Sequence, residues 1–252
     1  MKLAPLLDDY TKKNTKDNWE DDCNRFVGFI DIMGFKDLVA RRPHNEIKHL
    51  LLQMNQTRSI LLKMLGIRDS DGKKENRVKS FSFSDSVVFV TKSDSPTDLV
   101  NLGAAMCICQ EATIQSGVPT KGAISHGKLT ADFERSIFFG QPLIDAYLLQ
   151  DQLFYYGVIV DNNAESLLKQ FIEERDSEFV HNHFVRLLTP LKTGMVTHFN
   201  IKLQSIQDDQ LDYLYNNVSG QPRKYVDNTI DMFKKMNEKK IQGDESSAQH
   251  KL

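Results

Sequence analysis

The chain has little cysteine and no long apolar run, and each shortage excludes a class of protein. Its three cysteines, Cys23, Cys107 and Cys109, are too few and too unevenly spaced to form a disulfide framework. No apolar stretch approaches the roughly 18–20 residues that cross a membrane. The N-terminal residues also lack the apolar core of a signal peptide. We therefore expect a cytoplasmic protein without a membrane partner.

An excess of charge of one sign is also lacking. The chain carries 32 lysine and arginine residues against 34 aspartate and glutamate residues, a net charge of −2. This balance gives no general basic field that would attract nucleic acid or acidic membranes, so we expect neither partner. Hydrophobic residues make up 40% of the 252 residues, which is enough for the core of one large domain or of one domain with an extension.

Two short segments each place an aspartate beside an apolar run typical of a strand. Asp31 follows such a run within residues 26–35, and Asp85 lies between two of them within residues 81–89. A carboxylate next to a buried strand is costly to desolvate unless it is paired, hydrogen-bonded or bound to metal. On neighbouring strands, the two could hold the divalent ions that accompany a nucleoside triphosphate. For either aspartate alone, a turn or a helix cap is an equally good explanation.

The order of elements over residues 25–126 predicts an α+β fold. We expect a strand at 25–31, a helix after Pro43, strands at 78–84 and 86–91, a helix from Ser95 to about 115, and a strand at 119–126. This βαββαβ order is ferredoxin-like, an antiparallel sheet with helices packed on one face. In that topology Asp31 and Asp85 come close together, which their spacing alone does not predict.

The rest of the chain predicts an α/β elaboration of the same domain. We expect a hairpin at about 128–139, helices at 141–152, 163–174 and 223–238, and strands at 156–160, 184–188 and 195–203. Residues 1–24 form a polar lead-in, and residues 25–240 form one domain whose C-terminal elaboration starts at about 161. Residues 241–252 are predicted to be a disordered tail.

These motifs resemble the catalytic domains of class III nucleotidyl cyclases. Residues 29–35 resemble the family's first metal motif, and the segment around Asp85 resembles the second, with Ser84 where the family has a glycine. Residues 121–127 and 138–149 are similar to the strand and the glycine-led helix that follow. The resemblance covers about residues 25–160. It is greatest to the bacterial pyrimidine cyclases, which make cyclic UMP or cyclic CMP in Pycsar anti-phage defence.

The resemblance implies a two-metal site. Asp31 and Asp85 would be the metal ligands, with the carbonyl of Ile32 as an extra ligand, for two Mg²⁺ or Mn²⁺ ions. The ions would activate the ribose 3′-hydroxyl and hold it in line with the α-phosphorus, expelling pyrophosphate. The substrate-binding residues implied or expected around this site are Ile32, Met33, Gly34, Phe35, Phe81, Lys121 and Asp145. Because such sites form between two subunits, the resemblance implies a homodimer, and its product implies a downstream effector that senses cyclic nucleotides.

The sequence departs from the family at two places. Phe81 replaces the lysine that selects adenine, which argues against a standard adenylate cyclase. The helix after Gly140 carries Ile144 and Leu148 where the family has an asparagine and often an arginine, and neither side chain can donate a hydrogen bond. Three polar residues could substitute for them: Lys121, Arg135 and Asp145. Otherwise turnover is low or absent, and the alternative function is a degenerate cyclase fold that binds a nucleotide or a partner without turnover.

Overall fold

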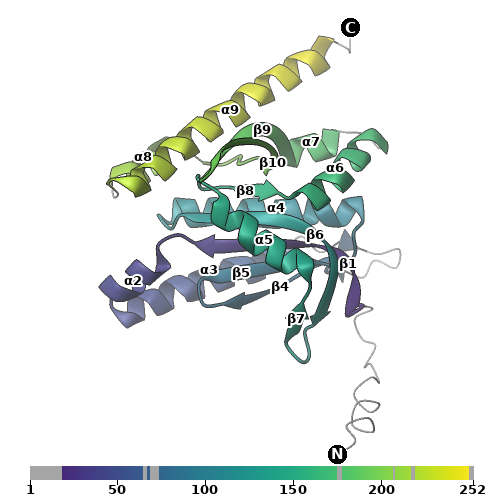
Figure 1. Ribbon diagram of the computed structural model, residues 1–252, viewed down its shortest axis with the longest axis horizontal. Helices are drawn as coiled ribbons and strands as arrows, with labels where there is room; N and C mark the ends of the chain where they lie inside the picture. The colour runs from purple at the N-terminus through teal and green to yellow at the C-terminus, as the bar shows by residue number, and fades with distance from the viewer. Residues whose placement is uncertain are drawn as a thin grey trace, which may run out of the picture.

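The computed structural model of the chain describes residues 19–64, 67–68, 74–174, 178–206, 208–216 and 219–249. Within these ranges, helices cover both faces of a mixed sheet (Figure 1). The strands are β1 (Asp22–Ile32), β2 (Ile67–Arg68), β3 (Lys74–Glu75), β4 (Val78–Phe83), β5 (Ser86–Thr91), β6 (Thr120–Asp132), β7 (Ile137–Phe139), β8 (Val158–Val160), β9 (Phe184–Leu191) and β10 (Gly194–Ile201). The helices are α2 (Phe35–Arg41), α3 (His44–Met64), α4 (Pro96–Gln115), α5 (Gln141–Gln152), α6 (Asn162–Glu174), α7 (Glu178–His183), α8 (Asp208–Asn216) and α9 (Gln221–Gln249). Along the ranges described, no helix has both the length and the apolar character needed to cross a membrane.

The central sheet is built around β1. Its strand order is β4-β5-β1-β6-β8-β10-β9, and β7 pairs with β6 beside this path. β1 pairs antiparallel with both β5 and β6, so the first strand lies between the later strands of the core. β6 and β8 pair in parallel, which requires a crossover, and α5 lies on that crossover. This topology confirms the predicted α+β fold.

Successive side chains of β1 face two different apolar layers, as the alternation of a strand requires. Ile30 packs in the layer beneath α4, whereas Val27 and Phe29 pack in the layer beneath α5. The close approach of α4 requires the glycine at position 28, because an added Cβ would lie 2.2 Å from the Sδ atom of Met106. Figure 1 shows α5 crossing the front of the sheet and α4 behind it. The helices of the βαββαβ core therefore share one face, and α5 covers the opposite one.

Four elements extend by three residues or more beyond their predicted ends. β1 begins at 22 rather than 25, β6 ends at 132 rather than 126, and β9 ends at 191 rather than 188. β1 and β6 pair along their whole length, so their hydrogen bonds continue both strands past the polar residues at which the prediction ended them. α9 continues to 249, where a disordered tail was predicted from 241; no proline stands in this stretch, so each residue can donate its backbone N–H to the helix. Residues 1–18 of the predicted lead-in, and 250–252 of the predicted tail, lie outside the described residues.

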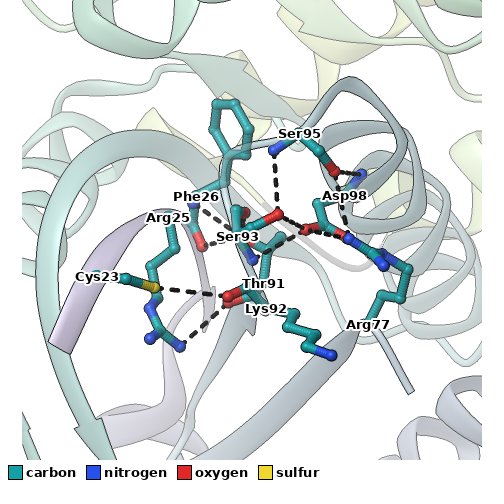
Figure 2. Close-up of polar contacts among 9 residues, drawn as sticks. All are labelled: Cys23, Arg25, Phe26, Arg77, Thr91, Lys92, Ser93, Ser95 and Asp98. Atoms are coloured by element: carbon teal, nitrogen blue, oxygen red, sulfur yellow. Dashed lines mark hydrogen bonds and ion pairs between the residues drawn. The ribbon is translucent and has the colours of Figure 1, made fainter. Parts of the chain in front are cut away.

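A polar network stabilises the end of the sheet opposite Asp31 (Figure 2). The fully buried carboxylate of Asp98 accepts hydrogen bonds from Nε and Nη2 of Arg77, the latter at 3.1 Å, and from the backbone N–H of Ser93 at 2.9 Å. The hydroxyl of Ser95 caps α4 by accepting the N–H of Asp98 at 3.2 Å, which confirms the predicted start of this helix. The network therefore joins the start of β4, the end of β5 and the N-terminus of α4.

Candidate functional site

The candidate site lies where β1 ends and the β4–β5 hairpin turns. Asp31 is the penultimate residue of β1, and Asp85 lies in the tight turn between β4 and β5. The turn is held to β1 because the backbone N–H of Ile32 donates a hydrogen bond to the carbonyl oxygen of Asp85 at 3.3 Å. Ser84, the other turn residue, has a φ of 55°, a conformation that glycine adopts at lower cost. The topology thus places the two aspartates on adjoining ends of neighbouring strands.

The two carboxylates interact electrostatically. Burial raises the pKa of Asp31, the hydrogen bond from the Ser86 hydroxyl to Oδ1 at 2.8 Å lowers it, and the negative charge of Asp85 raises it again. Repulsion between two carboxylates is relieved when a cation binds between them. The free protein therefore holds Asp31 in an environment that favours a bound positive charge.

The donor atoms fit a divalent cation that arrives with a substrate. Carboxylate and carbonyl oxygens are the ligands that Mg²⁺ and Mn²⁺ prefer, and Asp31, Asp85 and the Ile32 carbonyl are of this type. Within the described part of the chain, no group of three or more His, Cys, Asp or Glu side chains could hold a metal ion by itself. Mg²⁺ is commonly bound through one or two carboxylates together with water and substrate phosphates. The residues present are therefore sufficient only in combination with a phosphorylated ligand.

The β1–α2 turn contains the next three residues expected at the site. The backbone N–H of Met33 donates to the carbonyl of Pro119 at 2.9 Å, so it is not available to a phosphate. The Met33 side chain packs against the apolar cluster formed by α8 and α9. Gly34 has a φ of 72° and open space around an added Cβ, so its backbone conformation is what requires glycine. Gly34 is exposed and Phe35 is half-buried, which leaves both accessible to a ligand.

Lys121 lies directly beside Asp31. The two residues are paired in register between β1 and β6, and the Lys121 side chain is almost fully buried. Its Nζ donates to the carbonyl oxygen of Asp151 at 3.0 Å, and the Asp151 carboxylate binds Nζ of Lys192 at 2.9 Å. The pKa of Lys121 is lowered to about 8, mainly by burial and also by the charge of Lys192, while Asp151 and Asp31 act in the opposite direction. The site therefore contains a buried amine between two carboxylates.

Phe81 belongs to an aromatic cluster within its own chain. Its ring is stacked on Phe138, with the ring centroids 3.8 Å apart and the planes at 17°. Phe133 contacts both rings edge-on. One face of Phe81 is thus already covered, which leaves at most the other face for the base that was expected to stack there.

The helix α5 presents apolar side chains to solvent where the family has polar ones. Ile144 and Leu148 are both about half exposed, at 51% and 55%, and so is Tyr147 at 52%. The ring of Tyr147 contacts Phe29 edge-on, with the centroids 5.5 Å apart. Its hydroxyl can donate a hydrogen bond, which neither Ile144 nor Leu148 can do, whereas the ionised carboxylate of Asp145 can only accept one.

The three polar residues considered as substitutes each have a local partner. Arg135 donates from Nη1 to the Asp132 carboxylate at 2.6 Å, within the β6–β7 turn. Asp145 accepts from Nε2 of Gln141 at 2.8 Å, one helical turn away. Lys121 is engaged as described above, and of the three it alone adjoins Asp31.

Three residues of this site were not predicted from the sequence. Ser86 follows Asp85 in the chain, but its hydrogen bond to Asp31 forms only because the register of β1 and β5 pairs these two residues, and the sequence does not give that register. Asp151 lies in the last turn of α5, where the helix dipole disfavours a carboxylate, and that misplaced charge is a signal the sequence does contain. Lys192 carries no such signal, because its contact depends on where the β9–β10 hairpin folds.

Comparisons with known proteins identify the fold. No protein-family model matches the chain, and no curated protein matches it. Among solved structures, the guanylate cyclase domain of RhGC from Catenaria anguillulae in complex with GTP has a TM-score of 0.53 at 12% identity, over 74% of this chain and 100% of that one. The catalytic core of a rhodopsin-guanylyl cyclase with converted specificity, in complex with ATPαS, has a TM-score of 0.52 at 14% identity, over 72% and 97%. The non-canonical dimeric guanylyl cyclase domain of the RhoGC fusion protein from the aquatic fungus Blastocladiella emersonii has a TM-score of 0.52 at 13% identity, over 71% of this chain and 94% of that one. The chain therefore has the fold of class III nucleotidyl cyclase catalytic domains.

Proposed function

We propose that this chain is a nucleotidyl cyclase, which converts a nucleoside triphosphate to a 3′,5′-cyclic monophosphate and pyrophosphate. The observation that carries the proposal is the placement of Asp31 and Asp85 at one turn, where their charges interact. The likeness to guanylyl cyclase domains supports it at the level of the fold.

In the proposed reaction, the ribose 3′-oxygen forms a bond to the α-phosphorus. The bond from that phosphorus to the pyrophosphate oxygen breaks, and the proton of the 3′-hydroxyl leaves to solvent. Divalent ions, when bound, supply charge that neutralises the triphosphate and lowers the pKa of the attacking hydroxyl. Asp31 and Asp85 hold those ions, and the Ser86 hydroxyl orients the Asp31 carboxylate. Lys121 adds a positive charge beside Asp31 on the adjacent strand.

The proposed substrate is a pyrimidine triphosphate, UTP or CTP. The support is the resemblance of residues 81–89 and 138–149 to pyrimidine cyclases, together with Phe81 in place of the adenine-selecting lysine. On the same resemblance, the cyclic nucleotide is the signal of a Pycsar anti-phage defence and is read by a separate effector protein.

The proposed active form is a homodimer. In a single chain, Asp31 is half-buried at the end of β1, on the side of the sheet that α5 covers. The exposed face of α5, with Tyr147 between Ile144 and Leu148, is the surface that a second copy would cover. A partner's α5 would then complete each site and exclude water from it.

A second candidate function is nucleotide binding without turnover. Ile144 and Leu148 favour it, because neither can stabilise a ribose or a developing negative charge. In this case the metal and triphosphate still bind at Asp31 and Asp85, and the bound state itself, rather than a product, is the signal.

Incubation with each of the four nucleoside triphosphates and Mn²⁺ or Mg²⁺ tests both candidates. We expect a cyclic pyrimidine monophosphate and pyrophosphate, and a loss of at least about a hundredfold in rate for Asp31→Ala and for Asp85→Ala, the size typical of removing one preorganised electrostatic contact. Asp37→Ala, which removes an exposed carboxylate of α2, is the control and should retain the rate. Product formation that survives both substitutions would contradict the mechanism. Calorimetric binding of a non-hydrolysable triphosphate without product at any metal concentration would establish the second candidate instead.

A further inference from the structure

An elongated cavity of about 380 Å³ lies between α3 and the β4–β5 hairpin. Both His44 and Arg58 line it, and at 1.5 Å per residue the α3 segment between them is about 21 Å long. The α3 side chains between these ends are mainly aliphatic, Ile47, Leu51 and Met54 among them. The cavity therefore has an apolar side along α3 that an extended hydrocarbon chain would contact.

The cavity is distinct from the surface that carries the Asp31 carboxylate. Val87, which lines it, packs in the apolar layer beneath α4, whereas Phe29 of β1 packs in the layer beneath α5. Since alternate residues of a strand share a face, Asp31 is on the α5 side together with Phe29. Asp85, at the turn of the hairpin, is the one residue of the candidate site that lines the cavity.

Arg58 brings an uncompensated positive charge to one end of this cavity. Its Nη2 donates to the Asn55 side chain, but its Nη1 is fully buried and has no hydrogen-bond partner. Burial lowers the pKa of the guanidinium, and the nearest titratable group that acts on it is the buried thiol of Cys109. No carboxylate in the described part of the chain forms an ion pair with it. The guanidinium is thus partly buried and lacks a counter-ion among the described residues, so a bound anion at this end of the cavity would offset its cost of desolvation.

The other polar residues that line the cavity favour an anion with a single negative charge over one with several. Lys48 adds a second cation to the lining and Asp85 adds a carboxylate, while Ser82 and Ser84 contribute hydroxyls. A group with several negative charges would be repelled by Asp85, whereas a single charge is balanced by Arg58. The bidentate geometry of a guanidinium matches that of a carboxylate.

We propose that this cavity binds an aliphatic monocarboxylate, with its carboxylate on Arg58 and its hydrocarbon chain along the apolar side of α3. Such a ligand would contact the turn that holds Asp85 from the face opposite Asp31. Its occupancy would thus be sensed at the candidate site without competing for it. The proposal does not depend on cyclase activity, and its test is a binding measurement on the full chain.

The probes are hexanoate, octanoate and decanoate below their micellar concentrations, with 1-octanol as the uncharged match and inorganic phosphate as the anion without a chain. We expect calorimetry to show saturable binding that tightens by up to about fourfold for each added methylene, from the transfer of that group out of water. Octanoate should bind about tenfold more tightly than 1-octanol because only the acid pairs with the guanidinium. Equal binding of octanoate and 1-octanol, or of phosphate and decanoate, would overturn the proposal.

Variants of Arg58 separate a built site from adsorption. Arg58→Met keeps the chain length and removes the charge, so octanoate should bind about tenfold more weakly, while Arg58→Lys should retain most of the affinity. Without ligand, Arg58→Met should unfold at a higher temperature than the wild type, because it removes a partly buried charge that lacks a counter-ion among the described residues. Arg41→Met, on the exposed end of α2 outside the cavity, is the matched control and should bind like the wild type. Binding that is the same in all four proteins would show surface adsorption and would refute the site.

Discussion

At the residue scale, the candidate site contains charged side chains that burial destabilises one by one and that neighbouring opposite charges stabilise. Burial opposes the charge on both Asp31 and Lys121, which shifts their pKa values toward the neutral forms. Asp151 and Lys192 extend the set to four alternating charges. The Asp151 carboxylate lies 2.9 Å from Nζ of Lys192 and 3.8 Å from Nζ of Lys121, so both lysines share it, and Lys121 interacts with Asp31 as well. Residues from the C-terminal elaboration thus contribute directly to the environment of a core aspartate.

The pH dependence of stability should report the buried state of Lys121. Its pKa is about 8 in the folded chain, and that of a lysine in an unfolded chain is about 10.4. Between these values only the unfolded chain binds the proton, so the free energy of unfolding rises as the pH increases through this window. Lys121→Met should remove this rise, whereas Lys128→Met, an exposed lysine of the same strand, should keep it. Urea unfolding from pH 7 to 10.5 measures it, and equal slopes in the two variants would contradict the assignment.

At the element scale, the sheet and α4 are joined by one buried ion pair. Arg77 precedes β4, Asp98 lies in the first turn of α4, and Ser93 follows β5 (Figure 2). The Asp98 side chain is fully buried and that of Arg77 is 23% exposed, so solvent screens the pair only weakly. Loss of one partner would leave a buried charge with its donors unsatisfied.

Asp98→Ala should therefore lower the free energy of unfolding by about 3–5 kcal/mol, the range for breaking a buried pair from one side. Asp94→Ala is the control, because Asp94 lies in the same loop, is 45% exposed and pairs only with His126 at 3.4 Å. Its cost should stay within about 1 kcal/mol, as for other exposed pairs. Denaturant unfolding monitored by the fluorescence of Trp19 compares them, and similar costs for both substitutions would refute the role of Asp98.

The sequence predicts best those elements whose formation depends on residues that are close together in the chain. The continuous apolar run of β1, the hairpin around Asp85 and the capped start of α4 at Ser95 and Pro96 are all local patterns, and all were found. The full length of β6 was not predicted, because Lys128 and other polar residues continue the strand only through its pairing with β1. The short helices α7 and α8 were also missed. The closeness of Asp31 and Asp85 followed from topology, whereas the contacts of Lys192 follow only from long-range packing.

At the scale of the whole molecule, the outer face of α5 is apolar. Ile144, Tyr147 and Leu148 of this helix are each about half exposed. Contiguous exposed apolar side chains of this size mark interaction surfaces more often than free ones. This face of α5 is the surface that the second copy covers in the proposed homodimer.

Leu148→Glu tests this arrangement. Burying a glutamate without a partner in a dimer interface is costly, so the variant should run as a single 28.9 kDa chain in light scattering while the wild type runs at twice that mass. If each site needs both subunits, the variant should also lose cyclic nucleotide formation. Ile108→Glu is the matched control, because Ile108 is 43% exposed on α4, which lies on the opposite face of the sheet from α5, and its substitution should leave mass and activity unchanged (Figure 1). A wild-type chain that is monomeric at micromolar concentration and fully active would refute the shared site. A dimer that survives Leu148→Glu would move the interface to another face.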